Sequence, residues 1–132
     1  MNARSFPPSA LFDQGLALRR HMFGSEDTER QIETATDFTR PLQEMVTRAC
    51  FGELWHRPHL DLKIRSMMTL AMLAVLGRPN QIKAHVKGAI ANGVSPEEIR
   101  EILLHAATYG GLPAAVDSFA AAGEALAEVD QP

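Results

Sequence analysis

A histidine on an apolar helical face is the first residue of this sequence that could do chemistry. His85 falls within "LGRPNQIKAHVKGAIANGV" (residues 76–94), and helical spacing places it beside Ile82, Val86 and Ala89. Imidazole changes its charge near neutral pH and can either donate or accept a proton. The pattern alone leaves two interpretations open: a core histidine that a neighbour satisfies, or a group that moves protons.

Cationic and aromatic residues form three further features of the chain. They are an arginine in the most apolar segment, a basic and aromatic loop, and a tyrosine at a turn: Arg65; Trp55, His56, Arg57 and His59 in "WHRPH"; and Tyr109 in "YGGLP". Guanidinium groups bind carboxylates as bidentate forks, and aromatic rings can wall a pocket. Each feature also has a structural interpretation, because such an arginine usually pairs with a carboxylate and such a loop is often surface or interface.

The spacing of the ligand-type residues argues against a metal site and against a thiol nucleophile. His56 and His59 lie three residues apart with Pro58 between them, so one helical face does not hold both, and no third ligand is near in sequence. Cys50 is the only cysteine, which excludes an internal disulfide and a CxxC pair. No P-loop, GxSxG, HExxH or GxGxxG pattern occurs.

The chain has the composition of an ordinary globular domain. Its 132 residues are 45% hydrophobic and carry a net charge of −3, without the basic block that nucleic-acid binding favours. The N-terminal "MNARSFPPSALFD" lacks the apolar core of a secretory signal. The longest apolar run, residues 67–76, falls short of the roughly 20 residues that cross a bilayer. We therefore expect one cytoplasmic domain over 1–132, with loose tails at about 1–8 and 130–132, and neither membrane nor nucleic acid as a partner.

The segments that must position these residues carry helix signals throughout, and no long stretch alternates with the period of a strand. Caps, prolines and glycines predict helices at about 9–23, from Ser25, after Asp37 or Thr39, at about 61–76, from Pro79 to the Asn-Gly at 92–93, from Ser95 to the Gly-Gly at 110–111, and from Pro113 to about 129. Residues 52–62 are predicted to connect two of these helices. The sequence thus predicts an all-α, single-domain bundle of short antiparallel helices.

Apolar spacing also predicts which helical faces are buried. The inward stripe of one helix is predicted to be Phe38, Leu42, Met45, Val46 and Ala49. Segment 61–76 is apolar nearly all round, which predicts a central helix. The small residues within 114–123 suit close helix contact, either inside the domain or between subunits.

Three motifs carry a family resemblance that extends over nearly the whole chain. They are a G-x-x-W-x-R-P-x-L loop, an H-x-x-x-A-x-x-N-G helix and a Y-x-G-x-P turn, set within "FGELWHRPHLDLKIRSMMTLAMLAVLGR" and "HVKGAIANGVSPEEIREILLHAATYGGLPAAVDSF". "ALRRHMFGSE" and "TATDFTRPLQEMVTRACFGELW" extend the match upstream. The sequence closely resembles the carboxymuconolactone decarboxylase family. This resemblance implies a helical fold of the alkylhydroperoxidase D-like type and assembly into a trimer- or hexamer-type ring.

The thiol-active branch of that superfamily carries C-x-x-C-x-x-x-H. His85 matches its histidine, but Arg78 and Gln81 stand where the two cysteines would be. The position of the assisting glutamate falls at about Ser66. The resemblance therefore implies no thiol peroxidase activity for this chain.

The decarboxylase branch of the family implies a different reaction, the conversion of 4-carboxymuconolactone to β-ketoadipate enol-lactone in protocatechuate catabolism. The lactone carbonyl accepts the electrons left by CO₂, so no cofactor is needed. The resemblance implies that Arg57 and Arg65 bind the dianionic substrate, that His85 protonates the ring carbon, and that Trp55 and Tyr109 wall the pocket.

Two departures from the decarboxylase pattern bear on the substrate. Gln81 stands one helical turn before His85, where related sequences often carry a glutamate, and a neutral amide does not tune the imidazole as a carboxylate would. His56 and His59 stand where smaller residues are more usual in the family. We expect Gln81 and His56 to contact the substrate. The alternatives are a lyase or isomerase that acts on another carboxylated lactone or cyclic acid, or a non-catalytic oligomer that binds a small acid.

Overall fold

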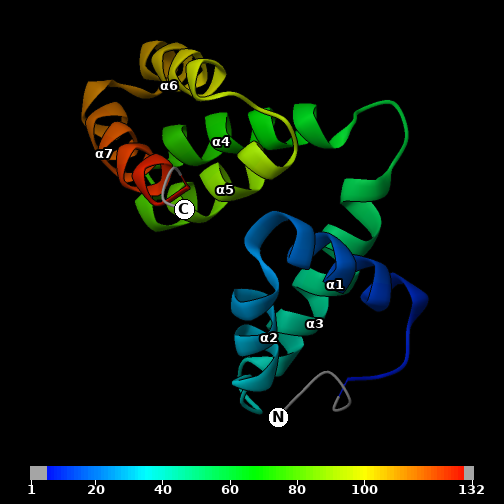
Figure 1. Cartoon of the computed structure of the whole chain (residues 1–132). Coiled ribbons are helices and arrows are strands. Elements are labelled where there is room, and N and C mark those ends of the chain that lie inside the picture. Colours follow the sequence, from blue (N-terminus) through cyan, green and yellow to red (C-terminus); the bar gives the residue numbers. More distant parts are fainter. Residues whose placement is uncertain (1–5, 130–132) are drawn as a thin grey trace. The chain divides into compact units, whose positions relative to one another are not determined.

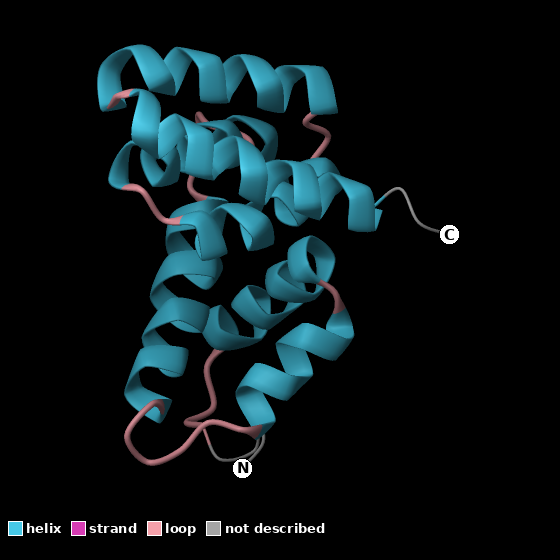
Figure 2. Ribbon diagram, turned by 90° about the vertical axis from the view of Figure 1, so that its left-hand side faces the viewer, coloured by secondary structure: helices cyan, strands magenta, loops and turns pink. Residues whose placement is uncertain are grey.

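The computed structural model describes residues 6–129, and all regular structure in that range is helical (Figure 2). Its elements are α1 (Ala10–Phe23), α2 (Ser25–Glu33), α3 (Arg40–Met45), the π-helix η2 (Val46–Glu53), the 3₁₀-helix η3 (Leu54–His56), α4 (Leu62–Leu76), α5 (Pro79–Ala91), α6 (Pro96–Gly110) and α7 (Leu112–Val129) (Figure 1). The predicted all-α class is confirmed. Residue contacts divide the chain after Asp61 into an N-terminal unit and a C-terminal unit, each described here by itself.

Local capping chemistry begins and ends most of these helices where the sequence predicts. Ser9 accepts a hydrogen bond from the backbone N–H of Phe12 at the start of α1. Ser95 and Glu98 form a reciprocal capping box at the start of α6. Gly24, with a φ of 91°, ends α1 in a backbone conformation that other residues rarely adopt. These predicted boundaries are confirmed to within one or two residues.

The N-terminal unit is held together by an unusually close approach of α1 to η2. A Cβ atom added to Gly15 would lie 1.8 Å from the carbonyl oxygen of Thr47, and one added to Gly52 would lie 2.1 Å from that of Leu11. The side-chain amide of Gln14 donates to the Gly52 carbonyl at 2.8 Å. Only glycine allows the two backbones to come this close.

A buried arginine ties together three other elements of the same unit. Arg19 is only 4% exposed. Its guanidinium donates to Gln31 of α2 at 2.7 Å, to Gln43 of α3 at 2.9 Å and to Thr47 of η2 at 2.8 Å. The acceptors are all neutral, so the cation is held by hydrogen bonds rather than by a carboxylate.

The ordered N-terminal unit begins earlier than predicted. Phe6 is buried and stacks on Phe12 with ring centroids 5.0 Å apart. The expectation that residues 1–8 form a loose tail is therefore wrong for Phe6. Pro7 and Pro8 are exposed and without regular structure, and the other expected tail residues, 1–5 and 130–132, lie outside the described residues.

The predicted inward stripe around α3 is wrong for its first three residues. Phe38 is 93% exposed, and Leu42 and Met45 are more than half exposed. The stripe assumes one regular helix with a period of 3.6 residues, whereas Phe38 lies in the turn before α3, and α3 lasts only six residues before the π-helix η2 changes the period. Thr47 and Phe51 are buried instead.

The segment predicted to connect two helices is partly helical itself. Residues 52–56 complete η2 and form η3, so the irregular connection covers only residues 57–61. Gly52, the first residue of the predicted connection, lies instead within η2, where its missing Cβ lets it pack against α1. Thr39 precedes α3 as predicted, but its hydroxyl accepts from the backbone N–H of Thr36 rather than from the helix.

The C-terminal unit consists of α4 to α7 around an apolar core. Its buried cluster includes Leu70, Ile82, Val86, Ile99 and Leu103. Salt bridges from Lys83 to Glu124 and from Lys87 to Glu128 join α5 to α7 along the surface. The small residues of α7 that are buried, Ala115, Ala121, Ala122 and Ala125, therefore serve internal packing.

Helix α4 contacts all three other helices of this unit, yet it is not buried all round as its composition suggests. Its buried residues are Ser66, Leu70 and Ala74, while Met72 and Leu76 are 56% and 63% exposed. Within this unit, three neighbouring helices leave part of its apolar surface uncovered.

Candidate active site

His85 occupies the interior side of α5, between buried residues of the core. The ring is half-buried, its Nδ1 atom is shielded from solvent, and Ile82 and Val86 beside it are fully buried. Burial lowers the pKa of His85 from 6.5 to about 4, because desolvation disfavours the charged imidazolium. The expectation that this histidine titrates near neutral pH is thus wrong for the protein without substrate. The imidazole is neutral at pH 7 and can accept a proton when an anion binds beside it.

Acidification is expected to destabilise the protein through this residue. The folded-state pKa of His85 is about 4 and the ordinary value is 6.5, so between these pH values the unfolded chain binds more protons. The stability that the neutral His85 side chain contributes is fully present above about pH 6.5 and is lost as the pH falls toward 4. At about 1.4 kcal/mol per pKa unit, discounted for the partly exposed ring, the loss is roughly 2 kcal/mol.

Urea unfolding at pH 7, 5.5 and 4.5 measures this effect, with His85→Gln as the comparison. The variant should show a flatter decline in unfolding free energy between pH 7 and 4.5. An identical decline in both proteins would contradict the role of His85.

Gln81 lies on the same helix as His85, and Arg65 lies on the preceding helix, α4. Gln81 is exposed and lies one turn before His85 on the same face of α5. Arg65 is half-buried in the first turn of α4, and Thr69 donates to its backbone carbonyl at 2.8 Å. Helices α4 and α5 are antiparallel, which puts the backbones of Arg65 and His85 about 10 Å apart along the helix axes.

The end of α5 contains a side-chain bond that sequence reasoning missed. Asn92 donates from Nδ2 to the hydroxyl of Ser66 on α4 at 3.0 Å, and Ser66 is fully buried. In the sequence, the Asn-Gly pair indicates only the end of a helix. The available signal was a serine within an apolar helix and an asparagine within the family motif.

The predicted site residues of the N-terminal unit differ in exposure. Trp55 is buried and packs against Phe51 with ring centroids 5.5 Å apart. His56 and Arg57 are exposed at the end of η3. His59 adopts a φ of 81°, a conformation that costs energy for a residue with a Cβ atom.

Tyr109 is at the end of α6 in the C-terminal unit and is 77% exposed, with its ring 5.4 Å from that of His105. The structure therefore places Arg65, Gln81 and His85 on paired helices of one unit. Trp55, His56 and Arg57 belong to the other unit.

Cys50 has the properties of a structural thiol. Burial raises its pKa, and a hydrogen bond from the Trp55 side chain and the charge of Arg19 oppose that rise. A raised pKa leaves little thiolate to act as a nucleophile at neutral pH. Between Phe6 and Val129, the structure gathers no three histidine, cysteine or acidic residues at metal-binding distance. None of the helices in this range is long and apolar enough to span a membrane.

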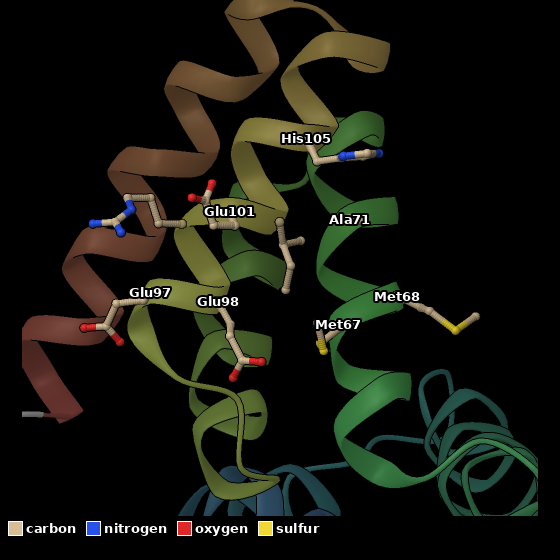
Figure 3. Close-up of a pocket in the computed structure, with 9 residues that line it drawn as sticks. Met67, Met68, Ala71, Glu97, Glu98, Glu101 and His105 are labelled. Atoms are coloured by element: carbon tan, nitrogen blue, oxygen red, sulfur yellow. The ribbon is translucent and has the colours of Figure 1, made fainter.

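An open groove of about 600 Å³ lies between α4 and α6 (Figure 3). Its apolar lining includes Met67, Ala71 and Ile102, and Glu97 and Glu101 add negative charge. An anionic substrate would be repelled by these carboxylates. None of the predicted site residues lines this groove, so we do not place the substrate there.

The chain belongs to the carboxymuconolactone decarboxylase family, whose family model matches residues 40–124. It is 44% identical over 108 residues to the nitrosuccinic acid decarboxylase npaB of Metarhizium robertsii, covering 82% of this chain and 76% of the relative. It is 37% identical over 103 residues to the 4-carboxymuconolactone decarboxylase of Acinetobacter baylyi, covering 78% and 77%. Both relatives are decarboxylases, which supports an enzyme of the carboxy-lyase class.

Proposed function

We propose that this protein decarboxylates 4-carboxymuconolactone to β-ketoadipate enol-lactone without a cofactor. The observation that carries the proposal is a histidine held neutral by burial on α5, in a chain related to two decarboxylases. A site partly withdrawn from water favours loss of CO₂, because a carboxylate is most stable when it is fully hydrated.

The substrate chemistry needs little more than binding groups and an acid. The bond to the departing carboxylate breaks, and its electron pair moves across the carbon–carbon double bond into the lactone carbonyl. Arg65 binds the remaining negative charge as a guanidinium fork. The incoming anion raises the pKa of His85, which takes up a proton and then delivers it to the carbanionic carbon. Carbon dioxide leaves, and the lactone keeps one carboxylate.

Nitrosuccinic acid is the second candidate substrate, favoured by the 44% identity to a decarboxylase of that compound. Its nitro group can accept the electron pair that the departing carboxylate leaves on the neighbouring carbon. Both acids thus combine an internal electron sink with a second carboxylate for anchoring.

The same proposal includes a homo-oligomer, a trimer or a hexamer. Met72, Leu76, Tyr109, Leu112 and Val116 of the C-terminal unit are each more than half exposed, and large exposed apolar surface usually indicates a contact with another protein. Light scattering of the purified protein gives its mass. The cytoplasmic location stays a prediction.

The test is an assay of the purified protein with each of the two acids, in which CO₂ release and substrate loss are followed together. We expect turnover of one acid to be at least 100-fold faster than that of the other, because a pocket that fits the transition state of one acid fits the other poorly. Loss of substrate without CO₂ would indicate a lyase or isomerase of another kind. Thermal stabilisation by an acid that is never consumed would indicate a non-catalytic binding protein.

A further inference from the structure

Two side chains join the helix that carries Arg65 to the helix that carries His85. Asn92 directly follows α5, and its Nδ2 atom donates to the hydroxyl of Ser66 on α4 at 3.0 Å. Ser66 has no exposed surface. This hydrogen bond joins two helices, with the Ser66 hydroxyl shielded from water and Asn92 half-buried, so losing the Asn92 amide would leave a buried hydroxyl without that partner.

The backbone around Asn92 is held in one conformation. Val94 donates its N–H to the carbonyl of Ala89 at 2.9 Å, and Gly93 donates to Ile90 at 3.0 Å, which is the bonding pattern of a Schellman motif. Gly93 has the φ of 92° that this motif needs. Val94 is 2% exposed and belongs to the same apolar cluster as Ala89. The backbone that carries the Asn92 side chain is therefore held in place where the amide contacts α4.

The position of Ser66 in the chain links this bond to the proposed chemistry. Ser66 directly follows Arg65, so a hydrogen bond that fixes Ser66 also restrains the backbone of Arg65. We propose that Asn92 is a positioning residue, which fixes the register of α4 against α5 so that Arg65 and His85 meet the same substrate. Asn92 touches no reacting atom in this role. The inference rests on the proposed function, and it assigns a task to the Asn-Gly end of α5.

The test compares two buried serines of the same unit. Ser66→Ala removes the acceptor of the interhelical bond, whereas Ser118→Ala removes a hydroxyl that bonds only to Ala114 of its own helix α7 at 2.8 Å. Both serines are at most 1% exposed, so the two substitutions remove the same group from equally buried places. We expect Ser66→Ala to lower kcat by about 10- to 100-fold with KM changed less than about threefold, since a shift near 1 Å can cost that much.

The control and a coupled variant separate positioning from general stability. Ser118→Ala should keep kcat within about twofold of the wild type. Asn92→Ala should resemble Ser66→Ala, and the double variant should be no worse than either single variant, because both remove the same bond. Equal kcat losses in Ser66→Ala and Ser118→Ala would overturn the inference.

A second measurement does not depend on turnover. The ring signals of His85 in an NMR spectrum, assigned with His85→Gln, should move in Ser66→Ala and stay in place in Ser118→Ala. If the wild type consumes neither acid, the proposed function fails, and these signals still decide whether the bond sets the helix register. Ring signals that stay unchanged in Ser66→Ala overturn the inference, whatever the activity.

Discussion

Replacement of His85 by alanine is expected to lower kcat/KM about 100- to 10,000-fold, the range found when a positioned general acid is removed. His85 is half-buried on α5 and has a pKa of about 4 without substrate. It therefore holds no proton at pH 7 until a bound anion raises its pKa. The variant can still bind the acid through Arg65 but cannot return a proton to carbon. We therefore expect the loss mainly in kcat, measured by steady-state CO₂ release.

His105→Ala is the matched control for that experiment. His105 belongs to the same unit, is exposed on α6, and its ring lies beside that of Tyr109. Its loss should leave kcat within about twofold, because no step of the proposed reaction uses it. An active His85→Ala enzyme would remove the proton-transfer role and leave the histidine as a core residue.

Gly15→Ala is expected to be the most destabilising single substitution among those described. The added Cβ would lie 1.8 Å from the Thr47 carbonyl oxygen and 2.9 Å from the backbone nitrogen of Gly52, and neither backbone atom can turn away. Helices α1 and η2 must separate, which also strains the bond from Gln14 to Gly52. A cost of about 3 kcal/mol or more is expected, as for overpacking that moves backbone. Urea unfolding measures it.

Gly123→Ala, in the C-terminal unit, is the comparison variant. Gly123 lies within α7, and no atom comes within 4 Å of a Cβ added there. Alanine should stabilise this helix by about 0.5–1 kcal/mol, because glycine is the more flexible residue when unfolded. If Gly15→Ala were as well tolerated as Gly123→Ala, the close helix contact would not exist in solution.

Helix boundaries could be predicted where short-range chemistry determines them. The capping box of Ser95 and Glu98 needs only residues three apart in the chain, and its prediction is confirmed. The π-helix could not be predicted in this way, because its Gly52 packs closely against α1, a helix distant in the sequence, and no short-range pattern indicates that contact. The periodicity argument then failed for Phe38 and Leu42, since it assumed one regular helix, whereas Phe38 lies in the turn before α3 and α3 lasts only six residues before η2.

In the candidate site, too, short-range features could be predicted and long-range contacts could not. Spacing alone places Gln81 and His85 on one helical face, and the structure agrees. The lowered pKa of His85 could not be predicted, because desolvation depends on which helices cover the ring. The bond from Asn92 to Ser66 spans 26 residues and needed the packed helices before it could be seen.

The buried guanidinium of Arg19 has a consequence for how the N-terminal unit folds. Its charge cannot be neutralised, and the acceptors from α2, α3 and η2 must all be in place before it leaves water. A partly folded unit that lacks one of these elements would bury an incompletely solvated cation. The three elements should therefore form and open as one cooperative block, with their backbone amides exchanging hydrogen at a common rate.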